Sequence, residues 1–191
     1  AGIGRWNAVD FARRGAVLTL FFLNPDKASV LQRDIIDAGG TLPSVIMMVM
    51  ADLGSVRQAA AEFVALGRPL DVLLNNAGVV NTSRKETVDG FEETLAVKHV
   101  APFLLTGLLL PAIQQASKSR IVNVASHAHT FVRDMGFGDM QAENGYKTFR
   151  EYGRSKLANI LFTRSLANKL QPQGITVNCL HPGAVATSLG S

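Results

Sequence analysis

Short apolar segments alternate along this chain with longer segments of helical periodicity, and no other feature constrains the fold as much. The apolar segments are rich in Val, Ile, Leu and Phe and end at turn residues, as is typical of strands covered on both faces of a parallel sheet. We expect such strands at 16–22, 43–50, 70–74, 120–125 and 174–180. We expect helices between and around them at 3–14, 25–38, 55–66, 90–116 and 149–170.

This order of strand and helix predicts an α/β fold with a doubly wound parallel sheet and helices on both faces. The 191 residues, 47% of them hydrophobic, suffice for one core, so we expect a single domain over 1–191. Ligands of such a sheet bind beyond the carboxyl ends of its strands. An irregular segment at 127–148 is long for a compact domain, and we expect it to have a functional role.

Composition excludes several classes of function. The net charge of +4 is scattered, with no run of five or six basic residues, so we expect no nucleic-acid partner, although some of this charge could attract a phosphorylated cofactor. The apolar run 100–113 is 14 residues long, too short for an ordinary membrane span, and is interpreted as a buried helix. No secretory signal opens the chain and Cys179 is its one cysteine, so we expect a cytoplasmic protein without a disulfide framework.

Three histidines, His127, His129 and His181, are the other candidates for a binding site. They show no ligand spacing with Cys or Asp, so we expect surface or hydrogen-bonding roles and no metal.

Two glycine-containing turns are candidates for binding a cofactor. Gly2 and Gly4 come directly before a helix, where glycine lets the backbone approach a pyrophosphate that the helix N-terminus stabilises. A plain turn at the start of a helix would also explain them. The sequence NNAG, 75–78, follows an apolar strand at the position of a ligand-binding loop, although a simple Asn/Gly turn is an alternative.

A tyrosine and a lysine, Tyr152 and Lys156, lie four residues apart on a predicted helix and therefore on one face of it. A free phenol has a pKa of about 10, and a lysine cation alongside stabilises the phenolate and brings proton transfer into the neutral range. Ser126, at the end of the strand 120–125, could hydrogen-bond a substrate oxygen as charge develops on it. An exposed Tyr and Lys on a helix remain the alternative.

Taken in order along the whole chain, these motifs resemble those of the short-chain dehydrogenase/reductase family, which implies a Rossmann-type fold. The motifs are Gly2-x-Gly4, Asp52-Leu53, NNAG at 75–78, Ser126, Tyr152-x-x-x-Lys156, and Pro182-Gly183 with Thr187. The single residue between the two glycines favours the ordinary type of the family over the extended type, which includes epimerases. Phrases such as YGRSKLANILF and HPGAVATSLG are most similar to a retinol dehydrogenase and WW-domain oxidoreductase branch, and we expect a microbial source.

The resemblance implies a role for each matching residue. Tyr152 would be the general acid in reduction and the base in oxidation, Lys156 would assist it and hold the nicotinamide ribose, and Ser126 would position the carbonyl. The remaining matches would contact the dinucleotide: Gly2, Ile3 and Gly4 at the pyrophosphate, Asp52 and Leu53 at the adenine, Asn75, Ala77 and Gly78 at the adenosine ribose, and Pro182, Gly183 and Thr187 at the carboxamide.

The sequence departs from the family pattern at Lys98, where the family usually has a fourth catalytic residue, an asparagine that anchors a water in the proton relay. A lysine has no acceptor, and near Lys156 it should destabilise one of the two ammonium groups. We expect a slower enzyme. The alternative is that Lys98 points to solvent and the relay uses other waters.

The family pattern also starts earlier and ends later than this sequence. The resemblance implies an apolar N-terminal strand and a longer glycine turn before Gly2, and a C-terminal part after Ser191 that carries the substrate loop. The absent strand would be central, so we expect unpaired backbone groups in the sheet.

The implied cofactor is NADP or NAD. No acid follows the strand at Phe22 and Leu23 to bind a ribose hydroxyl, and Arg5 is near, which favours NADP. The leading hypothesis is an NAD(P)-dependent oxidoreductase acting on a small-molecule substrate, a hydrophobic alcohol, aldehyde or ketone, and assembled as a homodimer or homotetramer through the helices 90–116 and 149–170. The alternative is a catalytically impaired dinucleotide-binding protein with a regulatory or interaction role.

Overall fold

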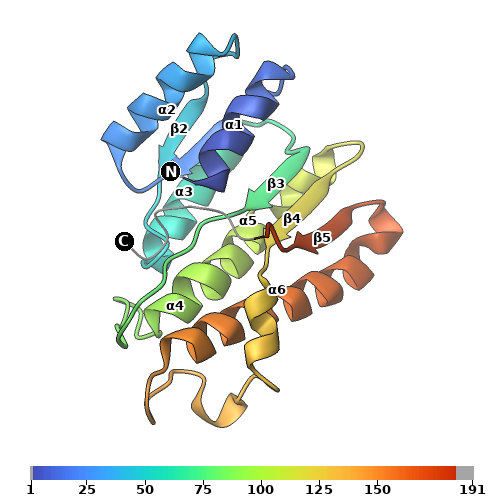
Figure 1. Cartoon of the computed structure of the whole chain (residues 1–191). Coiled ribbons are helices and arrows are strands. Elements are labelled where there is room, and N and C mark those ends of the chain that lie inside the picture. The colour runs from blue at the N-terminus through green and yellow to red at the C-terminus, as the bar shows by residue number, and fades with distance from the viewer. Residues whose placement is uncertain (1, 184–191) are drawn as a thin grey trace.

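The computed structural model describes residues 2–183, and parallel strands alternate with helices along this whole range (Figure 1). The strands are β1 (Thr19–Phe22), β2 (Ser44–Met47), β3 (Val72–Asn75), β4 (Arg120–Val124) and β5 (Thr176–Leu180). The α-helices are α1 (Ile3–Arg13), α2 (Pro25–Asp37), α3 (Leu53–Ala65), α4 (Glu93–Leu95), α5 (Ala101–Gln115) and α6 (Thr148–Leu170). A π-helix, η1 (Ala96–Val100), joins α4 to α5, and short 3₁₀ helices lie at η2 (His127–Phe131), η3 (Phe137–Asp139) and η4 (Gln171–Gln173).

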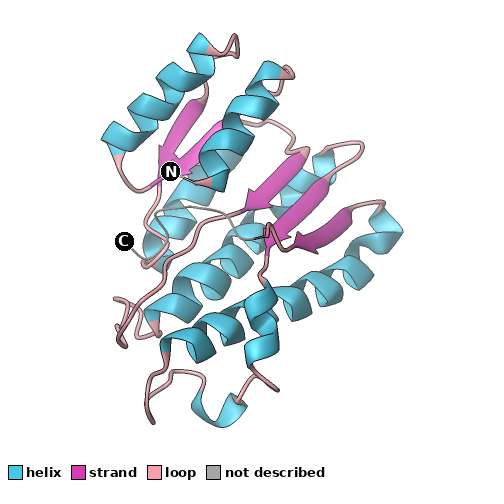
Figure 2. Cartoon of the chain, in the orientation of Figure 1, coloured by secondary structure: helices cyan, strands magenta, loops and turns pink. Residues whose placement is uncertain are grey.

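All strand pairs are parallel, in a two-stranded sheet β1–β2 and a three-stranded sheet in the order β3–β4–β5 (Figure 2). In the larger sheet Asn75, Asn123 and Cys179 share one row, so the three carboxyl ends lie side by side. The α/β class, the parallel sheet and the order of elements predicted from the alternation are confirmed.

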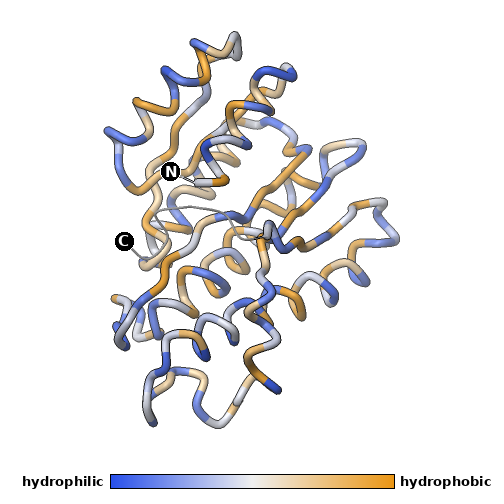
Figure 3. The backbone as a smooth tube through the Cα atoms, in the orientation of Figure 1, coloured by the Kyte–Doolittle hydropathy of each residue, from blue (hydrophilic) through white to orange (hydrophobic). Residues whose placement is uncertain are grey.

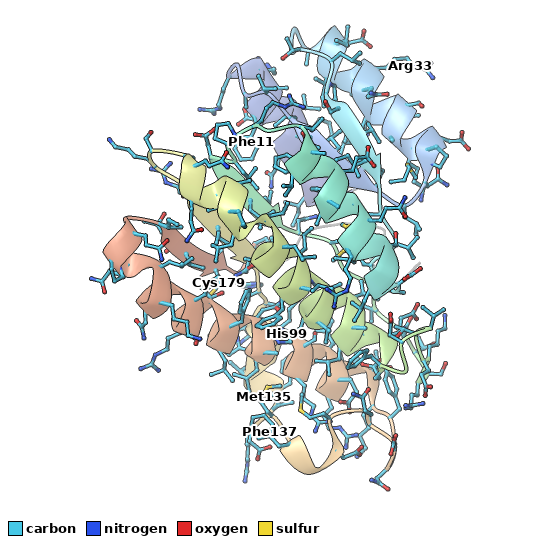
Figure 4. All side chains as sticks on the ribbon, turned by 180° about the vertical axis from the view of Figure 1, so that it is seen from behind. Phe11, Arg33, His99, Met135, Phe137 and Cys179 are labelled. Atoms are coloured by element: carbon cyan, nitrogen blue, oxygen red, sulfur yellow. The ribbon has the colours of Figure 1, made fainter. Side chains whose placement is uncertain are left out.

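Helices cover both faces of the strands because residues of one strand point alternately to two cores. Leu20 and Phe22 of β1 pack with α1 and α2 in one hydrophobic cluster, whereas Phe21 between them packs against the other. That larger cluster joins α3 and α5 to the strands, and Ile121 of β4 is fully buried in it. Seen from behind, α3, α5 and α6 lie in front of the strands (Figure 4). The result is the three-layer arrangement of a doubly wound fold.

The two sheets do not meet. A cavity of about 1290 Å³ lies between β1 and β3, lined mainly by apolar side chains of both strands and of α1 and α5. Among the described residues, β1 pairs only with β2 and β3 only with β4, so the edges that line the cavity have no partner strand. The lack of strand pairing at these edges is consistent with the expectation of unpaired backbone groups in the sheet.

The predicted helix 90–116 is helical from Glu93 to Gln115 but changes type twice, because the π-helix η1 interrupts it. In the described part of the chain this is the one helix long and apolar enough to cross a membrane, by length and composition. Half of its most apolar window is buried, and it packs against α3 and β3, as a core helix of a folded domain does. Figure 3 shows how hydrophobic residues run along the strands that it covers.

All five strands are shorter than predicted, and the differences are largest at β1 and β2, where the apolar residues at 16–18 and 48–50 lie outside the strands. Apolar character does not require strand pairing: Met48 is buried beyond the end of β2, whereas Val17 is exposed before β1. The predicted irregular segment 127–148 contains η2 and η3.

A polar network ties the carboxyl ends of β3 and β4 to the helices that cover them. The side-chain amide of Asn75 donates to Asn123 Oδ1 at 2.8 Å and to Thr106 Oγ1 at 3.1 Å. Asn123 in turn donates to Thr163 Oγ1 at 2.9 Å. Asn123 is buried, so losing one partner would leave the others unsatisfied in a low-dielectric core.

We therefore expect Asn123→Ala to lower the free energy of unfolding by about 1–3 kcal/mol, measured by urea denaturation. Asn178→Ala is the matched control, because Asn178 lies on the neighbouring strand β5 and is exposed. The control should change stability by less than about 0.5 kcal/mol. Equal effects of the two substitutions would contradict the network.

Candidate active site

The predicted serine, tyrosine and lysine come from β4 and α6, which pack together. Ser126 follows β4 by two residues and begins η2, where its hydroxyl oxygen accepts the backbone N–H of Ala128 at 3.2 Å. Tyr152 and Lys156 lie one turn apart on α6, which packs along η2. The structure thus brings the turn that carries Ser126 against the helix that carries Tyr152.

Gly153 makes this close packing possible. A Cβ added at Gly153 would lie 2.6 Å from the carbonyl oxygen of Ala128, which is closer than real Cβ atoms come to backbone. A glycine between Tyr152 and Arg154 therefore lets α6 touch η2 directly. The sequence analysis missed Gly153, because a glycine inside a helix gives no signal of what lies across from it.

Lys156 is held inside the site by the strand. Its side chain is buried, with the residue 4% exposed, and Nζ donates to the carbonyl oxygen of Val124 at 2.6 Å. The amine lies 5.8 Å from the centre of the Tyr152 ring. Burial lowers the pKa of Lys156 to about 8. The predicted pairing of the lysine with the tyrosine is consistent with this placement.

Lys98 lies in the same site and does not point to solvent. The residue is 2% exposed, and its Nζ lies 4.6 Å from the centre of the Tyr152 ring. Burial first, and then repulsion by the Lys156 cation, lower the pKa of Lys98 to about 7. The alternative of a solvent-facing Lys98 is wrong, and the expected repulsion between the two amines is present.

The π-helix η1 fixes where Lys98 lies. A π-turn breaks the regular backbone hydrogen bonds of a helix and is frequent at functional sites. The side-chain amide of Asn159 donates to the carbonyl oxygen of Lys98 at 2.9 Å, so α6 supplies a hydrogen-bond donor to the backbone of the π-helix. Asn159 Oδ1 also lies 3.1 Å from His99 Nδ1, and burial lowers the pKa of His99. Figure 4 shows His99 between two helices: α6, and the helix formed by η1 and α5.

The glycine turn at the N-terminus of α1 has the features of a pyrophosphate cradle. Gly2 has φ of 67°, a left-handed conformation, and no side chain caps the N-terminus of α1. A Cβ at Gly4 would lie 2.8 Å from the side-chain nitrogen of Asn76, so the turn packs against the loop that follows β3. Free N–H groups at a helix start and a backbone without side chains fit the phosphates of a dinucleotide. Ile3 is the first residue of α1, next to these glycines.

The other predicted binding residues lie near the same ends of the strands. Ala77 and Gly78 are in the loop after β3, whereas the Asn75 side chain is occupied by the network described above. Pro182 and Gly183 follow β5, and the rings of His181 and His127 lie 6.1 Å apart, so this segment adjoins the Ser126 turn. Thr187 lies outside the described residues.

Asp52 and Leu53 have structural contacts of their own. Asp52 caps α3, with its Oδ1 accepting the backbone N–H of Ser55 at 3.1 Å, and Leu53 N–H donates to Asp89 Oδ2 at 2.8 Å. Their contact with an adenine ring stays a prediction.

Arg5, which favoured NADP, is already paired. Its Nε donates to Asp34 Oδ2 at 2.7 Å, and this bond holds the pKa of the Asp34 carboxyl below its usual value. A ribose phosphate would therefore compete with Asp34 for the guanidinium.

A buried ion pair holds the segment 132–147 against α6. Arg154 Nη1 donates to Glu151 Oε2 at 2.8 Å, and its Nε donates to the carbonyl oxygen of Met135 at 2.9 Å. Its Nη2 donates to the carbonyl oxygen of Gly136, which has a left-handed φ of 57°. The i, i+3 spacing of Glu151 and Arg154 was the signal in the sequence that could have found this pair.

Among residues 2–183, no three His, Cys, Asp or Glu side chains are grouped to hold a metal ion. His129 Nδ1 lies 2.7 Å from the carbonyl oxygen of Ser126, which gives that histidine a hydrogen-bonding role.

Comparison with known proteins decides the family. A model of the short chain dehydrogenase family matches residues 1–191. This chain belongs to that family. It is 40% identical over 189 residues to mouse (Mus musculus) retinol dehydrogenase 11, covering 98% of this chain and 60% of that protein, and 39% identical over 193 residues to human retinol dehydrogenase 13, covering 99% and 57%. The resemblance to the retinol dehydrogenase branch is confirmed, and the chain spans about 60% of the length of these curated relatives.

Solved structures agree on the Rossmann-type fold. A Mycobacterium Paratuberculosis protein of uncharacterised function superposes with a TM-score of 0.83 at 33% identity, over 95% of this chain and 64% of the other. A metagenomic short-chain oxidoreductase in complex with NADP superposes with a TM-score of 0.77 at 26% identity, over 96% and 78%.

We expect Gly153→Ala to separate α6 from η2 and so to lower the free energy of unfolding by about 1–3 kcal/mol. Gly107→Ala is the matched control, because Gly107 is also helical and nothing lies within 4 Å of its added Cβ. Alanine at 107 should leave stability unchanged or raise it by up to about 1 kcal/mol through helix propensity. A stability loss in the control as large as at 153, measured in urea, would show that the contact with Ala128 is not the cause.

The buried amine of Lys98 predicts a dependence of stability on pH. A lysine in the unfolded chain keeps its proton up to about pH 10.5, whereas Lys98 in the folded protein has a pKa of about 7. Between these values the unfolded chain binds more protons, so stability rises with pH, and below pH 7 the contribution is constant. Lys98→Met should remove this contribution, which is on the order of a few kcal/mol, and leave the smaller rise that Lys156, with a pKa of about 8, causes at higher pH.

Urea denaturation between pH 6 and 10 measures this difference between the two proteins. Lys118→Met serves as the control, because Lys118 is exposed and should leave the slope unchanged. A Lys98→Met protein with the same slope as the unsubstituted chain would contradict the burial of a neutral amine.

Proposed function

We propose that this protein is an NAD(P)-dependent oxidoreductase of hydrophobic alcohols, aldehydes or ketones, with Tyr152 as general acid and base. The observation that carries the proposal is the placement of two buried lysine amines, 4.6 and 5.8 Å from the Tyr152 ring centre, on a helix packed against the Ser126 turn. A bound nicotinamide dinucleotide would supply or accept the hydride.

The side chains of the site would divide the remaining work. Tyr152 would donate a proton to the carbonyl oxygen in reduction and accept it in oxidation. Lys156, fixed by the carbonyl oxygen of Val124, would stabilise the phenolate left behind. Ser126 would hydrogen-bond the substrate oxygen as charge develops on it.

The N-terminus of α1, with the residues after β3 and β5, would hold the dinucleotide. Two neighbours support NADP as the cofactor: the metagenomic oxidoreductase solved with NADP, and a metagenomic blue fluorescent protein solved with NADPH, which is 29% identical with a TM-score of 0.72. The predicted contacts of Gly2, Ile3, Gly4, Ala77, Gly78 and Gly183 rest on their places at these strand and helix ends, with NAD as the alternative cofactor.

The names of the relatives support a hydrophobic substrate, since the matched mammalian proteins are retinol dehydrogenases. We also propose a cytoplasmic homodimer or homotetramer formed through α5 and α6. Large apolar side chains are exposed on both helices, with Phe103 at 55% and Leu161 at 47%, and such surfaces favour association.

Turnover with retinal and steroid ketones in the presence of NADPH tests this function. Tyr152→Phe should lower kcat by at least about 100-fold without loss of dinucleotide binding, because only the transferable proton is removed. Lys98→Asn should raise kcat on the order of tenfold, because it removes a competing cation and restores an acceptor. A Lys98→Asn rate equal to or below that of the unsubstituted protein would contradict this account of Lys98.

The second candidate function is a catalytically impaired dinucleotide-binding protein with a regulatory or interaction role. The second buried amine beside Tyr152 favours this function. Repulsion between Lys98 and Lys156 opposes the protonation of both amines, and the proposed catalyst needs a protonated Lys156 to stabilise the phenolate. Binding of NADPH without turnover of any carbonyl, and with no gain in Lys98→Asn, would select this function over the first.

A further inference from the structure

The two amines beside Tyr152 lie in a pocket of positive charge that no described carboxylate neutralises. Three elements pack against η1: α4, α5 and α6. From α6, the ionisable side chains that face Lys98 are Tyr152 and Lys156. Helix α5 contains no ionisable residue, and on η1 itself the neighbour His99 is paired with Asn159.

The glutamates on the neighbouring elements have hydrogen-bond or ion-pair partners other than the two lysines. Glu92 accepts the N–H groups of Thr94 and Leu95 at the start of α4, and Glu93 accepts the side-chain amide of Asn81 at 2.7 Å. On α6, Glu151 is paired with Arg154 and Arg150. A proton on Lys98 therefore adds a charge to the site that none of these carboxylates offsets.

We propose that Lys98 makes this site discriminate between the two redox forms of its dinucleotide, favouring the reduced form and so the direction of carbonyl reduction. The inference rests on the proposed function, since it requires that the nicotinamide binds beside Tyr152. It assigns to Lys98 a role in specificity that is separate from the rate of proton transfer.

The physical basis is the charge of the nicotinamide ring. The oxidised ring carries one positive charge and the reduced ring carries none, while the rest of the dinucleotide is the same. A protonated Lys98 is buried in a medium of low dielectric constant, where it repels the positively charged oxidised ring more strongly than it would in water. Lys156 also repels the oxidised ring, but a lysine at this position is part of the family motif. Lys98, at a position where the family usually has asparagine, would add a second repulsion to that of Lys156.

This discrimination depends on pH, and its part near pH 7 belongs to Lys98, because Lys156 has a higher pKa, about 8. The pKa of Lys98 is about 7, so the amine is mostly charged at pH 6 and mostly neutral at pH 9. The preference for the reduced form should be large at pH 6 and decline toward pH 9. By reciprocity, binding of the oxidised form should expel the proton of Lys98 near pH 7.

Isothermal titration calorimetry with NADP⁺ and NADPH at pH 6, 7 and 9 tests the inference on the folded chain. For the unsubstituted protein we expect the ratio Kd(NADP⁺)/Kd(NADPH) to fall about tenfold from pH 6 to pH 9. In Lys98→Met the ratio at pH 6 should be lower than in the unsubstituted protein, and only the dependence near pH 8 that Lys156 causes should remain. Lys118→Met, at an exposed position, is the matched control and should keep the full dependence.

Repeating the titrations at pH 7 in buffers of different ionisation enthalpy counts the protons released. Binding of NADP⁺ should release a fraction of a proton that is reduced in Lys98→Met and absent on binding of NADPH. If Lys98→Met does not fold, Lys98→Asn replaces it in both experiments, with the same expected result.

The outcomes separate the two proposals. Binding of both forms with a ratio that does not change with pH or with Lys98→Met overturns the role of Lys98 and leaves the oxidoreductase proposal intact. If neither NADP⁺ nor NADPH binds at any of the three pH values, the proposed function is overturned, and the inference with it.

Discussion

The hydrogen bond from Lys156 to the carbonyl oxygen of Val124 is the interaction on which the site depends, because it joins the helix that carries Tyr152 to the end of the central strand. This bond fixes α6 relative to the end of β4, and it therefore also fixes Tyr152, which lies one turn earlier on the same helix. Gly153 then allows α6 to touch η2, whose N-terminus Ser126 caps. The positions of three chemical groups thus follow from one strand end and one helix.

The burial of two lysines beside one aromatic ring is costly, and the fold shows how the cost is reduced. Lys156 has a carbonyl acceptor, and lowered pKa values let each amine lose its proton instead of remaining an unpaired buried ion. The π-helix η1 turns Lys98 toward Tyr152 and exposes a carbonyl that Asn159 satisfies. The site therefore holds a charge that varies near neutral pH, which an asparagine at position 98 would not provide.

The sequence predicted what depends on local pattern. The order of strands and helices and the Tyr152–Lys156 pair on one helix follow from burial and helical spacing and are present in the structure, although the strands are shorter than predicted. It did not predict what depends on contacts between distant segments: the clearance at Gly153, the bond from Arg154 to Met135, or the network that occupies the side chain of Asn75. The break at η1 was also missed, because the run 90–116 has the hydrophobicity of one continuous helix and the π-turn is fixed by α6.

The two halves of the candidate site rest on different parts of the fold. The half with Ser126, Tyr152 and Lys156 is built on β4 and α6, which contribute to the larger hydrophobic cluster, whereas the glycine turn begins α1, which packs with α2 and β1 in the smaller one. Strand β1 lies between the two clusters, the cavity separates β1 from β3, and Gly4 and Asn76 lie close together at the strand ends. A dinucleotide lying across those ends would touch both halves, so its binding would add the connection that the two sheets do not make with each other.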